Sequence, residues 1–193
     1  MELLGIDYGS KRAGTTVLAH LREGGIAFRA ARKGEDADQF ILRYCREYRP
    51  PLIALDAPLS LPGVFRDPDR YDDYFYRQAD RQAGAMSPMF LGGLTARAMR
   101  LARQIESLGL SVLEVYPSYL AREVLSLPGY KKEKDGLPTL LRQLAPLLPV
   151  RIDEVDLPDW HHFDALLSVL SALRYHNGEH LLFGNSEEGS IVV

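Results

Sequence analysis

The segment "ELLGIDYGSKRAGTTVLA", residues 2–19, decides the fold. Its first residues, up to Ile6, are almost all apolar and predict a buried strand, which ends on Asp7. A turn containing Gly9 follows, and a second apolar run begins at Thr15. A carboxylate at the end of a core strand costs free energy unless a cation meets it. The nature of that cation is the first question that this sequence raises.

Composition narrows the class of protein. The chain has 193 residues, 46% of them hydrophobic, which predicts one domain with a proper core and excludes wholesale disorder. The net charge of −3 gives no global basic field for nucleic acid, although a local basic patch stays open. The single cysteine, Cys45, forbids an internal disulfide and favours a reducing compartment. No signal-peptide pattern and no apolar run of about 18 residues is present, so we expect a cytoplasmic protein without a membrane span.

Periodicity predicts a regular order of strands and helices. Short connections make the first three strands an antiparallel meander, and the later strands alternate with helices. The predicted strands are 2–8, 14–20, 26–32, 52–56 and 110–118, and the predicted helices are 35–48, 94–109 and 158–178.

The remaining segments are predicted as additions to one domain, 1–193. Residues 59–94 are too polar and too short for a core of their own, and we interpret them as an insertion or lid. The charged run 130–136, "YKKEKDG", is predicted to be solvated surface. Residues 179–193 alternate like a terminal hairpin.

Three predicted core strands end on or near an acid: Asp7, Asp56 and Glu114. A fourth acid, Asp164, lies early in the last helix among apolar neighbours. If the three strands are adjacent and parallel, their carboxyl ends share the sheet edge where open α/β sheets place their sites. Carboxylates that converge there cannot all ionise without cations, and hard divalent ions such as Mg²⁺ prefer oxygen ligands. The sequence therefore predicts a metal site.

Seven short motifs in fixed order carry a resemblance that spans almost the whole chain: "GIDYGSKRAGTT", "IALDAPLSLP", "YRQADRQAGAM", "GGLTARAMRL", "LEVYPS", "FDALLSVLSA" and "EEGSIVV". They resemble the RNase H-like superfamily, and more closely the family called domain of unknown function 429, described as predicted RNase H-fold nucleases. The resemblance implies an α/β fold with a mixed five-stranded sheet, an antiparallel meander of its first three strands, and flanking helices.

The resemblance also implies a catalytic, metal-binding site of Asp7, Asp56 and Asp164 that holds Mg²⁺ or Mn²⁺. Glu114 fits the family's "EvYPs" motif and is a further catalytic candidate. It could instead be a buried acid paired with an arginine such as Arg81 or Arg97. The acid that RNase H carries on its first helix has no counterpart here, because Glu47 lies next to the end of that helix.

Four residues are candidates for substrate binding. Arg77 and Arg81 suit phosphate recognition because a guanidinium matches phosphate oxygens, although a structural ion pair with Asp80 is an equal alternative. Lys11 lies in the turn after Asp7 and could contact a phosphate. Thr95 is the predicted N-cap of its helix, at a glycine-rich helix start that could bind an anion.

Three functions remain open. The first is a metal-dependent nuclease acting on a nucleic acid or nucleotide, for which a resolvase-like homodimer is expected. The second is a non-catalytic binding module with the RNase H fold. The third is an actin-like or sugar-kinase phosphotransferase, which the first turn also resembles. His161, three residues before Asp164, is either catalytic or a surface residue of the helix start.

Overall fold

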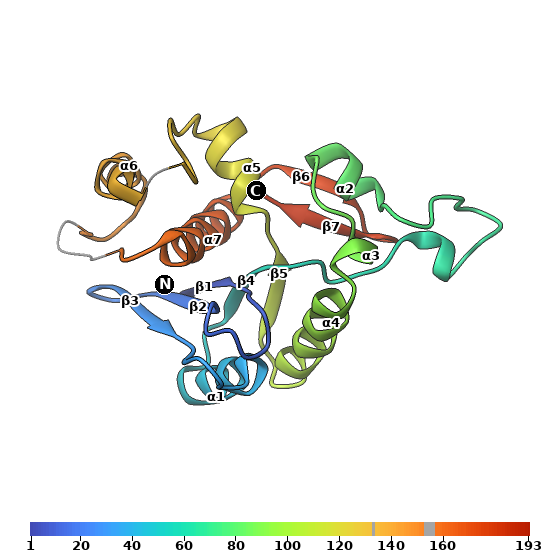
Figure 1. Ribbon diagram of the computed structural model, residues 1–193, viewed down its shortest axis with the longest axis horizontal. Helices are drawn as coiled ribbons and strands as arrows, with labels where there is room; N and C mark the ends of the chain where they lie inside the picture. The colour runs from blue at the N-terminus through green and yellow to red at the C-terminus, as the bar shows by residue number, and fades with distance from the viewer. Residues whose placement is uncertain (133, 153–156) are drawn as a thin grey trace.

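A five-stranded mixed sheet forms the centre of the molecule in the computed structural model, which describes residues 1–132, 134–152 and 157–193 (Figure 1). The strand order is β3-β2-β1-β4-β5. β1 pairs antiparallel with β2 and parallel with β4, and β5 continues the parallel half. This sheet and its meander confirm the fold class predicted from the sequence. The strands are β1 (Leu3–Asp7), β2 (Val17–Arg22), β3 (Gly25–Ala30), β4 (Leu52–Asp56) and β5 (Ser111–Glu114).

Helices cover both faces of this sheet. α1 (Ala37–Tyr48) and α4 (Gly93–Glu106) lie on one face, and α7 (Trp160–Asn177) crosses the other (Figure 1). Each face has its own buried cluster, built on side chains that alternate along the strands. Leu4 and Ile6 pack toward α1 and α4, whereas Leu3 packs on the α7 side. Because this alternation has a period of two, Asp7 also belongs to the α7 face.

α7 is buried along most of its length. Asp159 caps it by accepting a hydrogen bond from the backbone N–H of His162 at 3.0 Å, and Gly178 ends it in a left-handed conformation. The sheet covers one side of α7, and leucines of α6 (Leu137–Leu144) belong to the apolar cluster on its other side. The short elements α5 (Pro117–Tyr119), η2 (Leu120–Val124), η3 (Lys134–Gly136) and η4 (Ala145–Leu147) connect these layers.

The segment 59–94 and the C-terminus lie together beyond the carboxyl ends of β4 and β5. The segment contains η1 (Gly63–Phe65), α2 (Gln78–Ala83) and α3 (Pro88–Leu91). The C-terminus forms an antiparallel pair, β6 (Leu182–Asn185) and β7 (Gly189–Val192), which lies beside α2 (Figure 1). The interpretation as one domain with an insertion or lid at 59–94 stays a prediction.

The start of α4 differs from the sequence-based prediction. Gly92, not Thr95, is the N-cap, because the helix already begins at Gly93. The buried Thr95 hydroxyl instead donates to the Pro88 carbonyl at 2.7 Å and ties α3 to α4. Within the described residues, no helix is both long enough and apolar enough to span a bilayer.

Candidate metal centre

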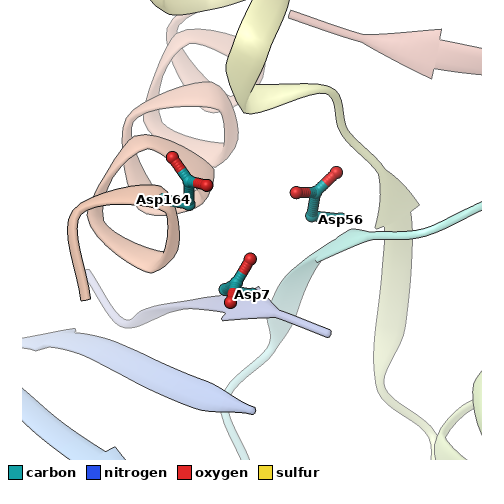
Figure 2. A group of neighbouring side chains, drawn as sticks. All are labelled: Asp7, Asp56 and Asp164. Atoms are coloured by element: carbon teal, nitrogen blue, oxygen red, sulfur yellow. The ribbon is translucent and has the colours of Figure 1, made fainter. Parts of the chain in front are cut away.

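Three carboxylates from three different elements come together at one edge of the sheet. Asp7 ends β1, Asp56 ends β4, and Asp164 lies in the second turn of α7 (Figure 2). One carboxylate oxygen of each lies within 4.8 Å of the others. The sequence-based prediction that these three acids converge therefore agrees with the geometry of the structure.

Strand register explains why Asp7 and Asp56 face each other. β1 and β4 are parallel neighbours, and Asp7 is the register partner of Asp56. Register partners in parallel strands point to the same face, so both carboxylates point toward α7. Asp164 then approaches from that helix and closes the group (Figure 2).

Asp7 is paired with a histidine from α7. Nδ1 of His161 lies 2.7 Å from Oδ2 of Asp7, and the His161 side chain is 44% exposed. This hydrogen bond to Asp7 raises the pKa of His161, because the carboxylate stabilises the imidazolium. His161 is therefore part of the site rather than a detached surface residue.

Asp164 is held by two neighbouring residues that sequence reasoning placed in the solvent. The Tyr130 hydroxyl donates to Oδ1 of Asp164 at 2.6 Å, and the Lys131 ammonium lies 2.7 Å from Oδ2. Tyr130 is buried, so the prediction of solvated surface for the whole run 130–136 is wrong at its start. An aromatic residue at the head of a charged run was the available signal, since buried tyrosines usually find a polar partner.

Asp56 is the one acid of the cluster whose carboxylate has no hydrogen-bonding or salt-bridging partner among the described residues. Burial raises its pKa well above the ordinary value, and the charges of Asp7 and Asp164 add to the effect. Burial likewise raises the pKa of Asp164, with Lys131 and Tyr130 opposing it. A cation placed among the three carboxylates would stabilise their charged forms and so lower the pKa values of Asp56 and Asp164.

The donor set fits a hard divalent cation. All three groups of the cluster offer carboxylate oxygens, which Mg²⁺ and Mn²⁺ prefer, and one of the three is unpartnered. The absence of cysteine from this cluster argues against a zinc thiolate site.

Glu114 does not join this group. In the register of β4 and β5 it pairs with Leu55, one step before Asp56, so its side chain points to the opposite face. It accepts hydrogen bonds from the Arg77 guanidinium at 2.5 and 2.8 Å and from the backbone N–H of Leu59 at 2.8 Å. Glu114 is thus a buried acid paired with an arginine, but the partner is Arg77 and not Arg81 or Arg97. A catalytic role for Glu114 stays a prediction.

Arg77 is a structural residue, and its prediction as a substrate-binding residue is wrong. Its side chain is fully buried, and its guanidinium donates to Asp80, Glu114 and Ser60. These charge-assisted bonds occupy its donors and leave no face for a phosphate. Thr95 is likewise buried and engaged with Pro88, so it does not face a ligand.

The two other substrate-binding candidates are surface residues with partners of their own. Lys11 forms a salt bridge with Asp36 at 3.2 Å, and Arg81 forms one with Asp73 at 2.8 Å. The Arg81 guanidinium also stacks over the ring of Tyr76. Exposed pairs of this kind are weak, so a role for either residue in substrate binding stays a prediction.

The first helix carries an acid that sequence reasoning missed. Asp38, in the first turn of α1, accepts from the Tyr8 hydroxyl at 2.5 Å and from Arg97 at 2.7 Å, and Arg100 lies 3.3 Å away. Asp38 is thus neutralised by arginines and stays outside the cluster of Asp7, Asp56 and Asp164. Its place in the first turn, where acids favour the helix dipole, gave no sign of this burial.

A cavity of about 360 Å³ opens beside Asp56. Its walls are mainly apolar, with Tyr8, Pro58, Met86, Leu94 and Tyr116 among them. Its charged lining residues are Asp56, Asp80, Glu114 and Lys131. A space of this size suits part of a ligand rather than a buried macromolecule.

Comparisons with known proteins identify the fold of this chain. No family model and no curated protein matches this chain, so the resemblance to domain of unknown function 429 is not shown. The chain is similar to T. thermophilus RuvC solved in complex with a Holliday junction substrate, with 17% identity, a TM-score of 0.51, and coverage of 93% of this chain and 97% of RuvC. A second Thermus thermophilus RuvC structure has 14% identity, a TM-score of 0.48, and coverage of 92% and 97%. With its sheet order, meander and flanking helices, the chain has the RNase H-like fold of RuvC.

Proposed function

We propose that this protein is a metal-dependent nuclease whose active site is the cluster of Asp7, Asp56 and Asp164. The observation that carries the proposal is the convergence of these three carboxylates within 4.8 Å, at the carboxyl ends of two parallel strands. That edge is where open α/β sheets bind ligands. The structural similarity to RuvC supports the proposal as an analogy of fold, since fold alone does not establish function.

The proposal assigns a role to the three acids of the cluster and to the residues that contact them. Asp7, Asp56 and Asp164 would hold one or two Mg²⁺ or Mn²⁺ ions. Such ions supply a nucleophilic water and stabilise the charge of the leaving oxygen in phosphodiester hydrolysis. Asp56 contributes an unpartnered carboxylate, and Tyr130 orients Asp164 through its hydroxyl. His161, half-exposed beside Asp7, would exchange a proton with solvent at the rim of the site.

The substrate class we propose is nucleic acid. The similar RuvC structure was solved with a Holliday junction, and the cavity beside Asp56 offers apolar and tyrosine walls for a sugar or a base. A homodimer and a cytoplasmic location accompany this proposal as expectations for a resolvase-like enzyme.

Metal binding tests the proposal first. We expect calorimetry to detect Mg²⁺ or Mn²⁺ binding by the wild type and its loss in Asp7→Asn, because the substitution removes one of the three carboxylate charges of the cluster. Asp69→Asn, at an exposed acid outside the cluster, is the matched control. Absence of binding at millimolar metal by a folded wild type would contradict the proposed site.

Cleavage assays then separate an enzyme from a binding module. A panel of single-stranded, duplex and branched DNA and RNA is incubated with wild type and Asp7→Asn in Mg²⁺ or Mn²⁺. We expect cleavage by the wild type and a loss of at least about 100-fold in the variant, because metal-bound water supplies several kcal/mol of the catalytic effect. Binding of a substrate without cleavage would favour the non-catalytic module.

A further inference from the structure

We propose that the Lys131 ammonium is the resident counter-cation of the metal-free acidic cluster and that it must leave Asp164 when a divalent ion binds. The inference rests on the proposed metal site and assigns a role to a residue outside the predicted ligand set. Lys131 would then be a positioning residue that sets metal affinity, not a metal ligand.

The contact with Asp164 is direct. Nζ of Lys131 lies 2.7 Å from Oδ2 of Asp164, while the Tyr130 hydroxyl occupies Oδ1 at 2.6 Å. Both oxygens of this carboxylate are therefore engaged in the metal-free protein. A divalent ion bound to Asp164 would stand within a few ångströms of the ammonium, and like charges at that separation repel strongly near a protein surface.

The single charge of Lys131 faces a cluster of three carboxylates. Its ammonium forms a salt bridge with Asp164, and its side chain lines the cavity beside Asp56. One lysine does not neutralise three carboxylates, and the Asp56 carboxylate has no hydrogen-bonding or salt-bridging partner among the described residues. The cluster thus holds a monovalent cation while retaining a charge deficit that a divalent ion would fill.

The backbone holds Lys131 in place at a conformational cost. Its φ is 58°, in the left-handed region of backbone conformation that residues other than glycine and asparagine rarely adopt. The neighbouring Tyr130 fixes the position of this turn, because its ring packs edge-on against Trp160 and its hydroxyl donates a hydrogen bond to Asp164. Strained residues persist where surrounding contacts over-determine them, and such positions cluster at functional sites.

The Lys131 side chain nevertheless has space for a second position away from Asp164. Lys131 is 41% exposed and lines the cavity of about 360 Å³ beside Asp56. A half-exposed lysine side chain changes rotamer readily, so release from Asp164 needs no rearrangement of the fold. The released ammonium would lie on the cavity side of the cluster.

The test compares metal affinities of the wild type with Lys131→Met, which removes the charge but keeps the length of the side chain. Calorimetry with Mn²⁺ at fixed pH and ionic strength should give binding at least about tenfold tighter in Lys131→Met, because the competing charge is gone. Lys132→Met, at the exposed neighbour, is the matched control and should stay within about twofold of the wild type. Lys131→Arg keeps the charge and should also bind close to the wild-type affinity. Lys131→Gln replaces Lys131→Met if circular dichroism shows that the latter does not fold.

The outcomes separate this inference from the proposed function. Equal affinities of the wild type and Lys131→Met, both abolished by Asp7→Asn, would overturn the role of Lys131 and leave the metal site intact. Absence of binding by every variant would overturn both. Binding by Lys131→Met alone would support both, with the ammonium as the barrier to metal entry.

Discussion

Gly5 of β1 lies directly against the backbone of Ala165 in α7. A Cβ added to Gly5 would stand 2.3 Å from the Ala165 carbonyl oxygen and 2.5 Å from the backbone nitrogen of Val169. This approach brings strand and helix to van der Waals contact just where each carries an acid, since Asp7 follows Gly5 by two residues and Asp164 precedes Ala165. The geometry of the acidic cluster therefore depends on the absence of a side chain at Gly5 as well as on the carboxylates.

Gly5→Ala should destabilise the fold by about 3 kcal/mol or more, because the atoms in the way belong to a helix backbone and cannot turn aside. Urea unfolding followed by circular dichroism measures the change. Gly93→Ala is the matched control, since a Cβ there meets nothing within 4 Å and alanine favours a helix. A Gly5→Ala midpoint equal to that of the wild type would show that the contact is looser than described.

Asp56→Asn should stabilise the metal-free protein at neutral pH. Burial raises the pKa of Asp56, so its contribution to stability is complete below about pH 4 and is lost as the pH rises through the folded-state pKa. Removing the charge should gain on the order of 1 kcal/mol at pH 7.5, or about 2–4 °C in Tm for a chain of this size.

Thermal melting in chelator from pH 4 to 8 measures this effect. The difference between Asp56→Asn and wild type should grow with pH and shrink when millimolar Mg²⁺ or Mn²⁺ is added, since only the wild-type carboxylate gains from the ion. A difference that is independent of pH would contradict the electrostatic explanation.

Arg77→Met should cost about 3–5 kcal/mol, because it leaves the buried carboxylates of Asp80 and Glu114 without their cation. Arg81→Met breaks an exposed pair with Asp73 and a surface stacking contact with Tyr76, and should cost less than about 1 kcal/mol. Equilibrium unfolding of both variants provides the comparison. Similar losses in the two variants would refute the structural role assigned to Arg77.

Tyr130→Phe should cost about 1.5–3 kcal/mol, because the phenyl ring keeps its contact with Trp160 while Asp164 loses a buried hydrogen bond to its carboxylate. Denaturant unfolding in chelator measures the loss. Tyr74→Phe, at an exposed ring, serves as the control and should change stability by less than about 0.5 kcal/mol. A neutral Tyr130→Phe would mean that Asp164 does not rely on this hydroxyl.

Much of the fold and the core of the candidate site could be predicted from short stretches of sequence. The apolar runs that end at Asp7 and Asp56 predicted buried strands, whose parallel pairing was a condition that the structure meets, and Asp159 and Gly178 marked the ends of the last helix. These signals are local, because strand periodicity and helix capping depend on residues that are close in the chain. The first residue of a helix was harder to predict where glycines precede it. Gly92, rather than Thr95, is the N-cap of α4.

The errors concern side chains whose partners are distant in sequence. Arg77 pairs with Glu114, 37 residues later, and Tyr130 reaches Asp164 across 34 residues. A basic residue bound to a buried acid and one that faces a phosphate have the same local pattern. Burial alone separates them, and burial follows from how elements pack.

The sequence by itself determined that three acids stand at the ends of core elements and that the fold is a mixed α/β sheet. Only the tertiary structure decided that Glu114 stays apart from the other acids. Register points Asp56 toward Asp7 and turns Glu114 to the other face, since neighbouring positions in a strand alternate between faces. Packing of the segment after Gly129 then brings Tyr130 and Lys131 to Asp164, because a buried carboxylate needs donors and a cation wherever the chain can supply them.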